Sequence, residues 1–300
     1  MNWWCSSSKQ TWVWTPRPYL GALIIVWTLF GVATWWRARG RHNTSVDPEV
    51  QAAQEALGEG AVRGSSTGRT WALLLGALGL WACLDWPLAS LGAGYLASAQ
   101  MARQILMVMV VAPLLLFACP APLAVRMIGW GKALTVLRVT ARPIFAVTFA
   151  AVALVAINAP AVVVPLVKTP FGAFGLDFVW VAAGFVLWMP VQCPHPGVRR
   201  LTGAAALCYL IAQSIVPVLP GFFMTWADQP IYSTYELAPR VFPGFDAVAD
   251  QQTAAAILQV GGMILLWFQI AYRFLKWAYE QIEQDNTTRK AMTKAGTAAP

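Results

Sequence analysis

Gln100, Arg103 and Gln104 form a polar group inside residues 97–118, a stretch that is otherwise strongly apolar. Side chains at positions i, i+3 and i+4 share one face of a helix, so the three would point in the same direction. Arg103 would lie about 10 Å inside this helix, at a rise of about 1.5 Å per residue. A charged side chain at that depth in a membrane is costly, and it indicates a functional site or a structural ion pair.

Arg103 therefore needs an acidic partner, and the sequence offers Asp85, Asp177 and Asp250. Asp177 is the preferred partner because it would lie at a similar depth from the same side of the membrane. Gln251, which follows Asp250, belongs to the same predicted polar cluster. Two interpretations stay open here: the cluster could line a polar pocket that opens outward, or the ion pair could only lock two helices together.

Sulfur-containing side chains are the second group with potential chemistry. Met101, Met107 and Met109 lie on one stretch, and thioethers are good ligands for Cu(I). Met107 and Met109 are about 200° apart around a helix of 3.6 residues per turn, so the three do not share a face. Gap-filling in a core explains these methionines better, although Met101 is also counted in the predicted polar cluster as a possible functional residue.

The five cysteines form neither a paired motif nor a disulfide framework. Cys5 and Cys83 fall on the same predicted side of the membrane and could pair or bind copper. Cys193 and His195 could supply two metal ligands, but a tetrahedral site needs two more and none is close in sequence. The sequence therefore predicts no metal site and no cofactor, with copper as the one ion left open.

The composition indicates that membrane helices position these residues. Of the 300 residues, 58% are hydrophobic and 11% are charged, and the mean hydropathy is +0.56, whereas about 25% charged residues is usual in soluble domains. A helix of about 17 to 25 apolar residues crosses a bilayer. Seven stretches qualify: 19–36, 71–88, 97–118, 143–159, 174–191, 201–219 and 253–276. The predicted fold class is all-α, a polytopic membrane bundle of seven helices.

The basic residues are distributed unevenly between the two sides of this bundle. Sixteen of the 21 lysines and arginines fall in the loops and the tail of one side, and four fall on the other. Because cytoplasmic loops are enriched in Lys and Arg, the N-terminus is predicted outside and the C-terminus inside. This placement accounts for the net charge of +8, so the lipid bilayer is a predicted partner and nucleic acid is not.

The predicted organisation has three parts. Residues 1–18 form an extracytoplasmic segment that lacks the features of a signal peptide. Residues 19–280 form the membrane domain, with a cytoplasmic loop at 37–70, in which 51–57 could be a short helix, and an outer loop at 220–250. Pro160 and Pro165 are expected to break the fourth helix and leave 161–168 along the outer surface. Residues 281–300 are predicted to be a disordered cytoplasmic tail.

Missing residues argue against several membrane activities. The chain has two histidines, His42 and His195, both in predicted cytoplasmic loops, which disfavours a bis-histidine haem inside the bundle. Lys276 lies at the inner end of the last span, so no buried lysine remains for a retinal Schiff base. The HExxH and GxSxG motifs are absent. The sequence therefore predicts a protein that is not an enzyme.

Six short segments occur in a distinctive order along about residues 70–280. They are 85–88 (DWPL), 98–104 (SAQMARQ), 112–120 (APLLLFACP), 183–190 (AGFVLWMP), 230–232 (PIY, with Tyr235) and 250–252 (DQQ). In this order they resemble the CtaG-like family of seven-helix assembly factors for caa3-type cytochrome c oxidase. The resemblance implies a seven-helix membrane scaffold that docks onto oxidase subunits.

The resemblance also implies a difference at the predicted site. The third helix of the family begins with a His-Met-x-x-His pattern, at positions where this chain has Gln100 and Gln104. Members also tend to carry histidines at the start of the fifth helix, near Ala173 and Asp177 of this chain. Histidines there would suit copper, whereas glutamine, arginine and aspartate would not. A salt-bridged polar cluster would then replace a histidine site.

These observations lead to one preferred function and two alternatives. The preferred function is a membrane-embedded assembly or accessory factor for haem-copper cytochrome c oxidase, in the cytoplasmic (inner) membrane of a bacterium. Its partners would be cytochrome c oxidase subunits or other assembly factors. One alternative is a transporter or channel with an outward polar pocket around Arg103. The other is a permanent structural subunit of a respiratory complex.

Overall fold

Helices make up all the regular secondary structure in the described part of the chain, which comprises residues 3–7, 10–42, 66–215 and 218–297 of a computed structural model. The predicted all-α fold class is confirmed for these residues. The short helix predicted at 51–57 lies outside them. Of the predicted cytoplasmic loop at 37–70, residues 37–42 continue the first helix and residues 66–70 begin the next one.

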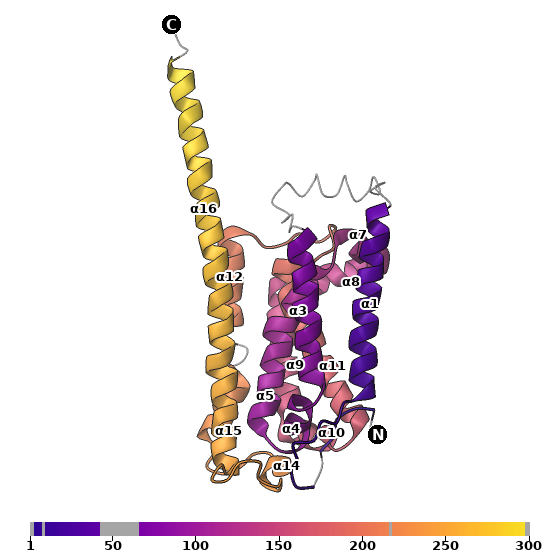
Figure 1. The fold of residues 1–300 in the computed structure, drawn as a ribbon. Helices are drawn as coiled ribbons and strands as arrows, with labels where there is room; N and C mark the ends of the chain where they lie inside the picture. The colour runs from indigo at the N-terminus through magenta and orange to yellow at the C-terminus, as the bar shows by residue number, and fades with distance from the viewer. Residues whose placement is uncertain (1–2, 8–9, 43–65, 216–217, 298–300) are drawn as a thin grey trace.

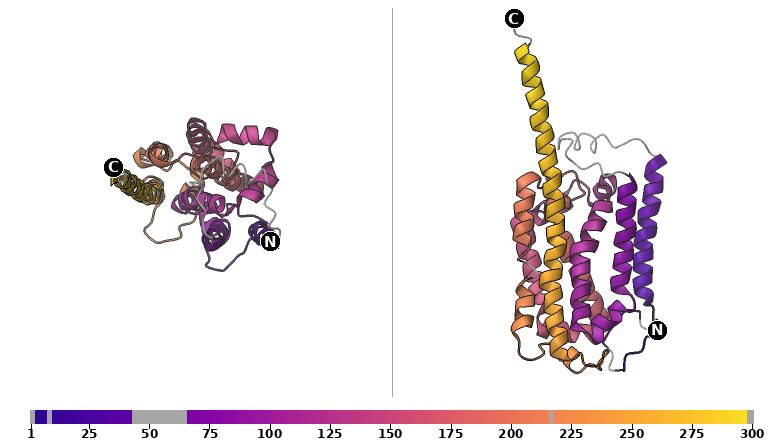
Figure 2. Two further views of the ribbon diagram at one scale, coloured as in Figure 1. Left: turned by 90° about the horizontal axis from the view of Figure 1, so that it is seen from above. Right: turned by 60° about the vertical axis from the view of Figure 1, so that its left-hand side comes forward.

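The helices of the bundle run between two ends of the molecule (Figures 1 and 2). They are α1 (Leu20–His42), α3 (Ser66–Leu84), α5 (Ala97–Ile105) continued by η1 (Leu106–Val111) and α6 (Ala112–Ala118), α9 (Pro143–Asn158), α11 (Pro170–Gln192), α12 (Gly203–Gln213), α13 (Val218–Trp226), and α15 (Ala247–Ala256) continued by η2 (Ile257–Gly261) and α16 (Gly262–Thr297).

Short helices define the two ends. We call the end that carries α4 (Leu88–Gly94), α10 (Pro160–Val167) and α14 (Ser233–Glu236) the α4 end. The opposite end carries α7 (Ala121–Ile128) and α8 (Lys132–Thr140), and we call it the α8 end. Helix α1 starts at the α4 end, whereas α16 extends beyond the α8 end (Figure 1).

Four helices of the described chain are long and apolar enough to cross a membrane: Thr67–Leu84, Ala97–Ala118, Pro170–Gln192 and Ala247–Lys290. A fifth candidate is the pair α8 and α9, whose axes differ by 76°. The apolar helices Leu20–Trp35 and Gly203–Gln213 are shorter. The chain is therefore an all-helical membrane protein with four or five candidate spans among the described residues, where the sequence predicted seven.

Three regions differ from the sequence prediction, for local reasons. Pro160 follows a break after Asn158, as predicted, but Pro165 breaks nothing: residues 160–167 form α10, and Pro160 takes its first position, where a missing N–H costs nothing. The start of the predicted outer loop is helical in α13. Helix α16 continues to Thr297, where a disordered tail was predicted, because no glycine or proline interrupts residues 263–295.

The core of the bundle is closely packed where α11 crosses η1 and α6. A Cβ atom on Gly184 would lie 2.8 Å from Cβ of Ala112 and 3.1 Å from Cα of Val108, so only glycine permits this approach. Four residues further along α11, the indole N–H of the fully buried Trp188 donates a hydrogen bond to the carbonyl of Val108 at 2.9 Å. This packing fixes α11 against the helix that carries Arg103.

Candidate functional site

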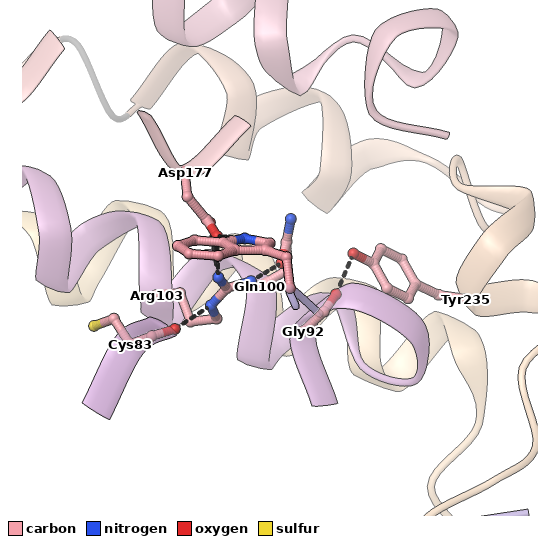
Figure 3. Close-up of polar contacts among 7 residues, drawn as sticks. Cys83, Gly92, Gln100, Arg103, Asp177 and Tyr235 are labelled. Atoms are coloured by element: carbon pink, nitrogen blue, oxygen red, sulfur yellow. Dashed lines mark hydrogen bonds and ion pairs between the residues drawn. The ribbon is translucent and has the colours of Figure 1, made fainter. Parts of the chain in front are cut away.

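Arg103 and Asp177 form the predicted salt bridge in the interior of the bundle (Figure 3). The Nη2 atom of Arg103 lies 2.7 Å from Oδ1 and 2.8 Å from Oδ2 of Asp177. Arg103 also donates through Nε to the carbonyl of Cys83 at 2.7 Å and through Nη1 to Oε1 of Gln100 at 3.0 Å. All three nitrogens of the guanidinium group have acceptors, which a buried charge requires.

Helix α4 and the ring of Trp180 enclose the guanidinium group. The Cζ atom of Arg103 lies 5.7 Å from the ring centroid of Trp180, which allows a cation–π interaction. A Cβ atom on Gly92 would lie 2.8 Å from Oε1 of Gln100 and 3.0 Å from Cδ of Arg103. The hydroxyl of Tyr235 donates to the carbonyl of Gly92 at 2.7 Å, which holds α4 in this position (Figure 3). Glycine at position 92 is therefore part of the site.

The N-terminal segment closes the site from the α4 end. The indole N–H of Trp4, which is 1% exposed, donates to Oδ2 of Asp177 at 3.0 Å. Two backbone hydrogen bonds fix this segment, from Gly21 to the carbonyl of Trp3 and from Ser7 to the carbonyl of Val167. Arg103 itself is 1% exposed. The geometry is that of an enclosed ion pair rather than an outward-facing pocket.

Trp4 is the residue of this candidate site that the sequence analysis missed. It lies 173 positions before Asp177, and no periodic pattern connects the two. The only signal was the concentration of tryptophan near the N-terminus, with Trp3, Trp4, Trp12 and Trp14 in the first 18 residues. A buried tryptophan usually needs an acceptor for its N–H, but the sequence does not say which one.

Asp250 and Gln251 lie in a neighbouring network and do not contact Arg103. Asp250 accepts hydrogen bonds from the backbone N–H of Ala97 at 2.6 Å and of Ser98 at 3.1 Å, so it caps the start of α5. Gln251 accepts from the N–H of Ile231 at 2.6 Å. The single polar cluster that the sequence predicted is therefore divided: Asp250 shares only helix α5 with the Arg103 site, and Gln251 binds the segment before α14.

Asp85, the third predicted candidate, also has other partners. It accepts from the N–H of Tyr19 at 2.9 Å and from the indole of Trp81 at 2.9 Å. It thus connects the start of α1 to the end of α3. Among the three carboxylates considered, only Asp177 pairs with Arg103 in the described chain.

Gln104 and Met101 lie beside the ion pair without joining it. Oε1 of Gln104 and Nε2 of Gln100 are buried and have no hydrogen-bond partner among the described residues. An unsatisfied buried group of this kind costs about 1 to 3 kcal/mol. Met101 and Met107 are fully buried in the apolar core, and Met109 is 3% exposed. Their surroundings are those of core methionines.

The arrangement does not suit copper at the positions where the resembling family has histidines. Gln100 and Asp177 bind the guanidinium group of Arg103, so a permanent positive charge lies at the centre. Cys5 and Cys83 are free thiols that interact electrostatically with this charge. Burial raises the pKa of Cys5 to about 12, although Arg103 opposes the rise, and a protonated thiol is a poor ligand. Within the described ranges, no three His, Cys, Asp or Glu side chains group as metal ligands.

Cys193 and His195, the other pair considered for a metal, have structural contacts at the α8 end. Nδ1 of His195 accepts from the N–H of Gly197 at 3.0 Å, and Nε2 lies 3.2 Å from the carbonyl of Gly129. Burial lowers the pKa of His195, so the imidazole is neutral with its proton on Nε2. Nε2 thus connects the loop after α11 to Gly129 after α7, whereas Nδ1 fixes the turn within its own loop.

A family model described as cytochrome c oxidase caa3 assembly factor matches residues 52–280. The matched range includes Gln100, Arg103 and Asp177, whereas Trp4 and α1 precede it. No curated protein and no solved structure matches the chain significantly.

Proposed function

Because the chain belongs to the family of cytochrome c oxidase caa3 assembly factors, we propose that it is a non-enzymatic factor in the biogenesis of a haem-copper cytochrome c oxidase. Membership of this family is the observation that carries the proposal. The protein acts in the bacterial cytoplasmic membrane. It works through contacts with oxidase subunits or other assembly factors, and needs no metal at the Arg103 site.

The proposed topology is seven spans with the N-terminus outside and the C-terminus inside. The 23 residues of α11 give a length of about 34 Å, which matches a hydrocarbon core of about 30 Å. The α8 end carries Arg69, Arg126, Lys132, Arg138, Arg142, Arg199, Arg200 and Arg273, whereas the α4 end carries Arg17, Lys168 and Arg240. The positive-inside rule then favours the α8 end as the cytoplasmic side.

The ion pair is proposed to stabilise the scaffold that presents the docking surface. Arg103 on α5 binds α3 through Cys83 and α11 through Asp177, and Asp177 in turn binds the N-terminal segment through Trp4. A transporter would need Arg103 to be accessible, but its side chain is buried and its donors have protein acceptors. No observation in the described structure favours the transporter over the assembly factor.

Photo-crosslinking from defined faces tests the assembly role. A photoreactive amino acid replaces Ile24 on α1, Phe223 on α13 or Phe268 on α16, whose side chains are 64%, 64% and 78% exposed. Leu187, which is fully buried, is the matched control. We expect an oxidase subunit or another assembly factor to be crosslinked from at least one exposed position and not from Leu187. Absence of any such product from all three faces would contradict the proposal.

Purification of the mature oxidase separates the assembly factor from a permanent subunit. An assembly factor should crosslink to oxidase subunits in whole membranes and be absent from the mature, active enzyme. A constant ratio of this chain to the other subunits in the mature enzyme would instead show a structural subunit. Deletion of the gene should lower the amount of assembled oxidase, measured by its haem absorbance in membranes.

A further inference from the structure

Two arginines at the α8 end hold consecutive residues at the end of α11. Nε of Arg200 donates to the carbonyl of Cys193 at 2.6 Å. In the amide orientation that satisfies both of its polar ends, Gln192 accepts from Nη2 of Arg273 at 2.9 Å and donates to the carbonyl of Pro113 at 3.2 Å. Arg200 follows α11 in sequence, whereas Arg273 lies on α16. Two distant parts of the chain therefore place a guanidinium group on consecutive residues at the end of α11.

The positive charges of these arginines are not neutralised within the described residues. Neither Arg200 nor Arg273 has a salt bridge there, and Nε of Arg273 is buried without a hydrogen-bond partner. Burial lowers the pKa of Arg200; Cys193 opposes this shift, and the neighbouring charge of Arg69 adds to it. Arg200 and Arg273 also repel each other. Because arginine stays charged in proteins, this convergence is unfavourable unless an anion compensates it.

Exposed aromatic residues beside the two arginines are consistent with a place at the membrane interface. Tyr272 directly precedes Arg273, and Tyr279 lies two turns beyond it; their side chains are 63% and 73% exposed. On α3, Trp71 follows Arg69 by two positions and is 60% exposed. Exposed Trp and Tyr residues are typical of the level where lipid headgroups begin. The charges thus lie where lipid phosphate groups are abundant.

We propose that Arg200 and Arg273 bind a phosphate group that is carried by the headgroup of an anionic lipid. Guanidinium groups match the geometry of phosphate oxygens, and each of these arginines has donors left over. Basic sites between membrane helices on the cytoplasmic side are typical of such headgroup binding. The bound lipid connects α16 to the end of α11. This site is separate from the Arg103 ion pair and goes beyond the assembly role.

Native mass spectrometry of the full-length protein in mild detergent tests the site. Equal amounts of phosphatidylglycerol and phosphatidylcholine are offered to the unmodified protein and to R200Q/R273Q. The control K132Q/R142Q loses the same charge from exposed side chains at the same end. Each basic side chain near headgroups contributes about fivefold in affinity, so the R200Q/R273Q variant should lose about 25-fold for phosphatidylglycerol. The control variant should retain its preference for phosphatidylglycerol.

Melting temperatures distinguish a lipid phosphate from a free phosphate, and the lipid preference of the unmodified protein controls for a variant that does not fold. Phosphatidylglycerol should raise the melting temperature of the unmodified protein. Neither phosphatidylcholine nor inorganic phosphate without lipid should raise it. A rise with inorganic phosphate alone would identify a free anion site and overturn the lipid assignment. Equal lipid binding by the R200Q/R273Q and K132Q/R142Q variants would overturn it too. If R200Q/R273Q does not fold, the absence of a phosphatidylglycerol preference in the unmodified protein decides against the site.

Discussion

Arg103→Ala and Asp177→Ala should each destabilise the protein strongly, because each leaves the partner's charge buried and unmatched. After Arg103→Ala, Asp177 keeps one donor, the indole of Trp4, and Oε1 of Gln100 loses its donor. After Asp177→Ala, the guanidinium group keeps only Gln100 and the carbonyl of Cys83. Breaking a buried ion pair from one side costs about 3 to 5 kcal/mol, and we expect each single variant to lie in this range.

The double variant should recover part of this loss. If the two residues acted independently, the costs would add to about 6 to 10 kcal/mol. Because they are paired, the double variant leaves only neutral groups unsatisfied, chiefly the carbonyl of Cys83 and the indole of Trp4, at about 1 to 3 kcal/mol each. Subtracting this residual cost from the additive sum leaves an expected coupling energy of about 4 kcal/mol, somewhat above the values of about 0.5 to 3 kcal/mol that are typical of contacting residues.

Thermal unfolding of the purified protein in one detergent measures this coupling. At about 2 °C per kcal/mol for a chain of this size, each single variant should lower the melting temperature by about 6 to 10 °C. The exposed pair Lys276 and Glu280, 3.8 Å apart, is the control, and its cycle should show a coupling below about 1 kcal/mol. Strictly additive effects of Arg103→Ala and Asp177→Ala would refute the reasoning, since they would show that the two charges do not depend on each other.

Four further expectations follow from the site and the topology. Trp4→Phe keeps an aromatic ring but removes the donor to Asp177, so it should cost about 1 to 3 kcal/mol in the unmodified protein and much less beside Asp177→Ala; equal costs in both backgrounds would contradict the contact. Stability should fall as the pH drops below about 6.5, the ordinary pKa of histidine. Burial lowers the pKa of His195, so below that pH the unfolded chain binds a proton that the native state does not bind. His195→Gln should therefore flatten a plot of melting temperature against pH. Reporter fusions after Lys132 should report cytoplasm and fusions near Tyr232 the outside, and an inverted result at Tyr232 would refute the seven-span topology. Elemental analysis after washing with a chelator should find copper well below one ion per chain, and near-stoichiometric retention would overturn our view of the Arg103 site.

The sequence predicts those features of the site that depend on one helix or on depth in the membrane. Gln100 and Arg103 share a face because helical periodicity is a local property. Asp177 was the preferred partner because a buried arginine in an apolar helix must be matched by a carboxylate at a similar depth. Both arguments need only the spacing of residues within a helix and the thickness of a bilayer, and the pairing in the structure confirms them.

The remaining features depend on contacts between distant segments, for which the sequence has no periodic signal. Asp250 is also near a predicted helix start, yet it caps the N-terminus of α5 instead of pairing with Arg103. Backbone N–H groups at a helix start also attract a carboxylate, but the sequence contains no sign that α5 would be the helix that Asp250 caps. Trp4 reaches Asp177 because a non-helical segment folds back under α11.

Enclosure by this N-terminal segment explains why Arg103 is better understood as part of the scaffold than as part of a pocket. Trp4 covers Asp177 from outside the membrane helices, and Gly92 allows α4 to close over Gln100. Water that reached Arg103 would weaken its electrostatic attraction to Asp177, because the interaction energy varies inversely with the effective dielectric constant. Excluding water therefore strengthens the pair once it has formed. The segment that the sequence left unexplained thus makes a costly buried charge compatible with a stable bundle.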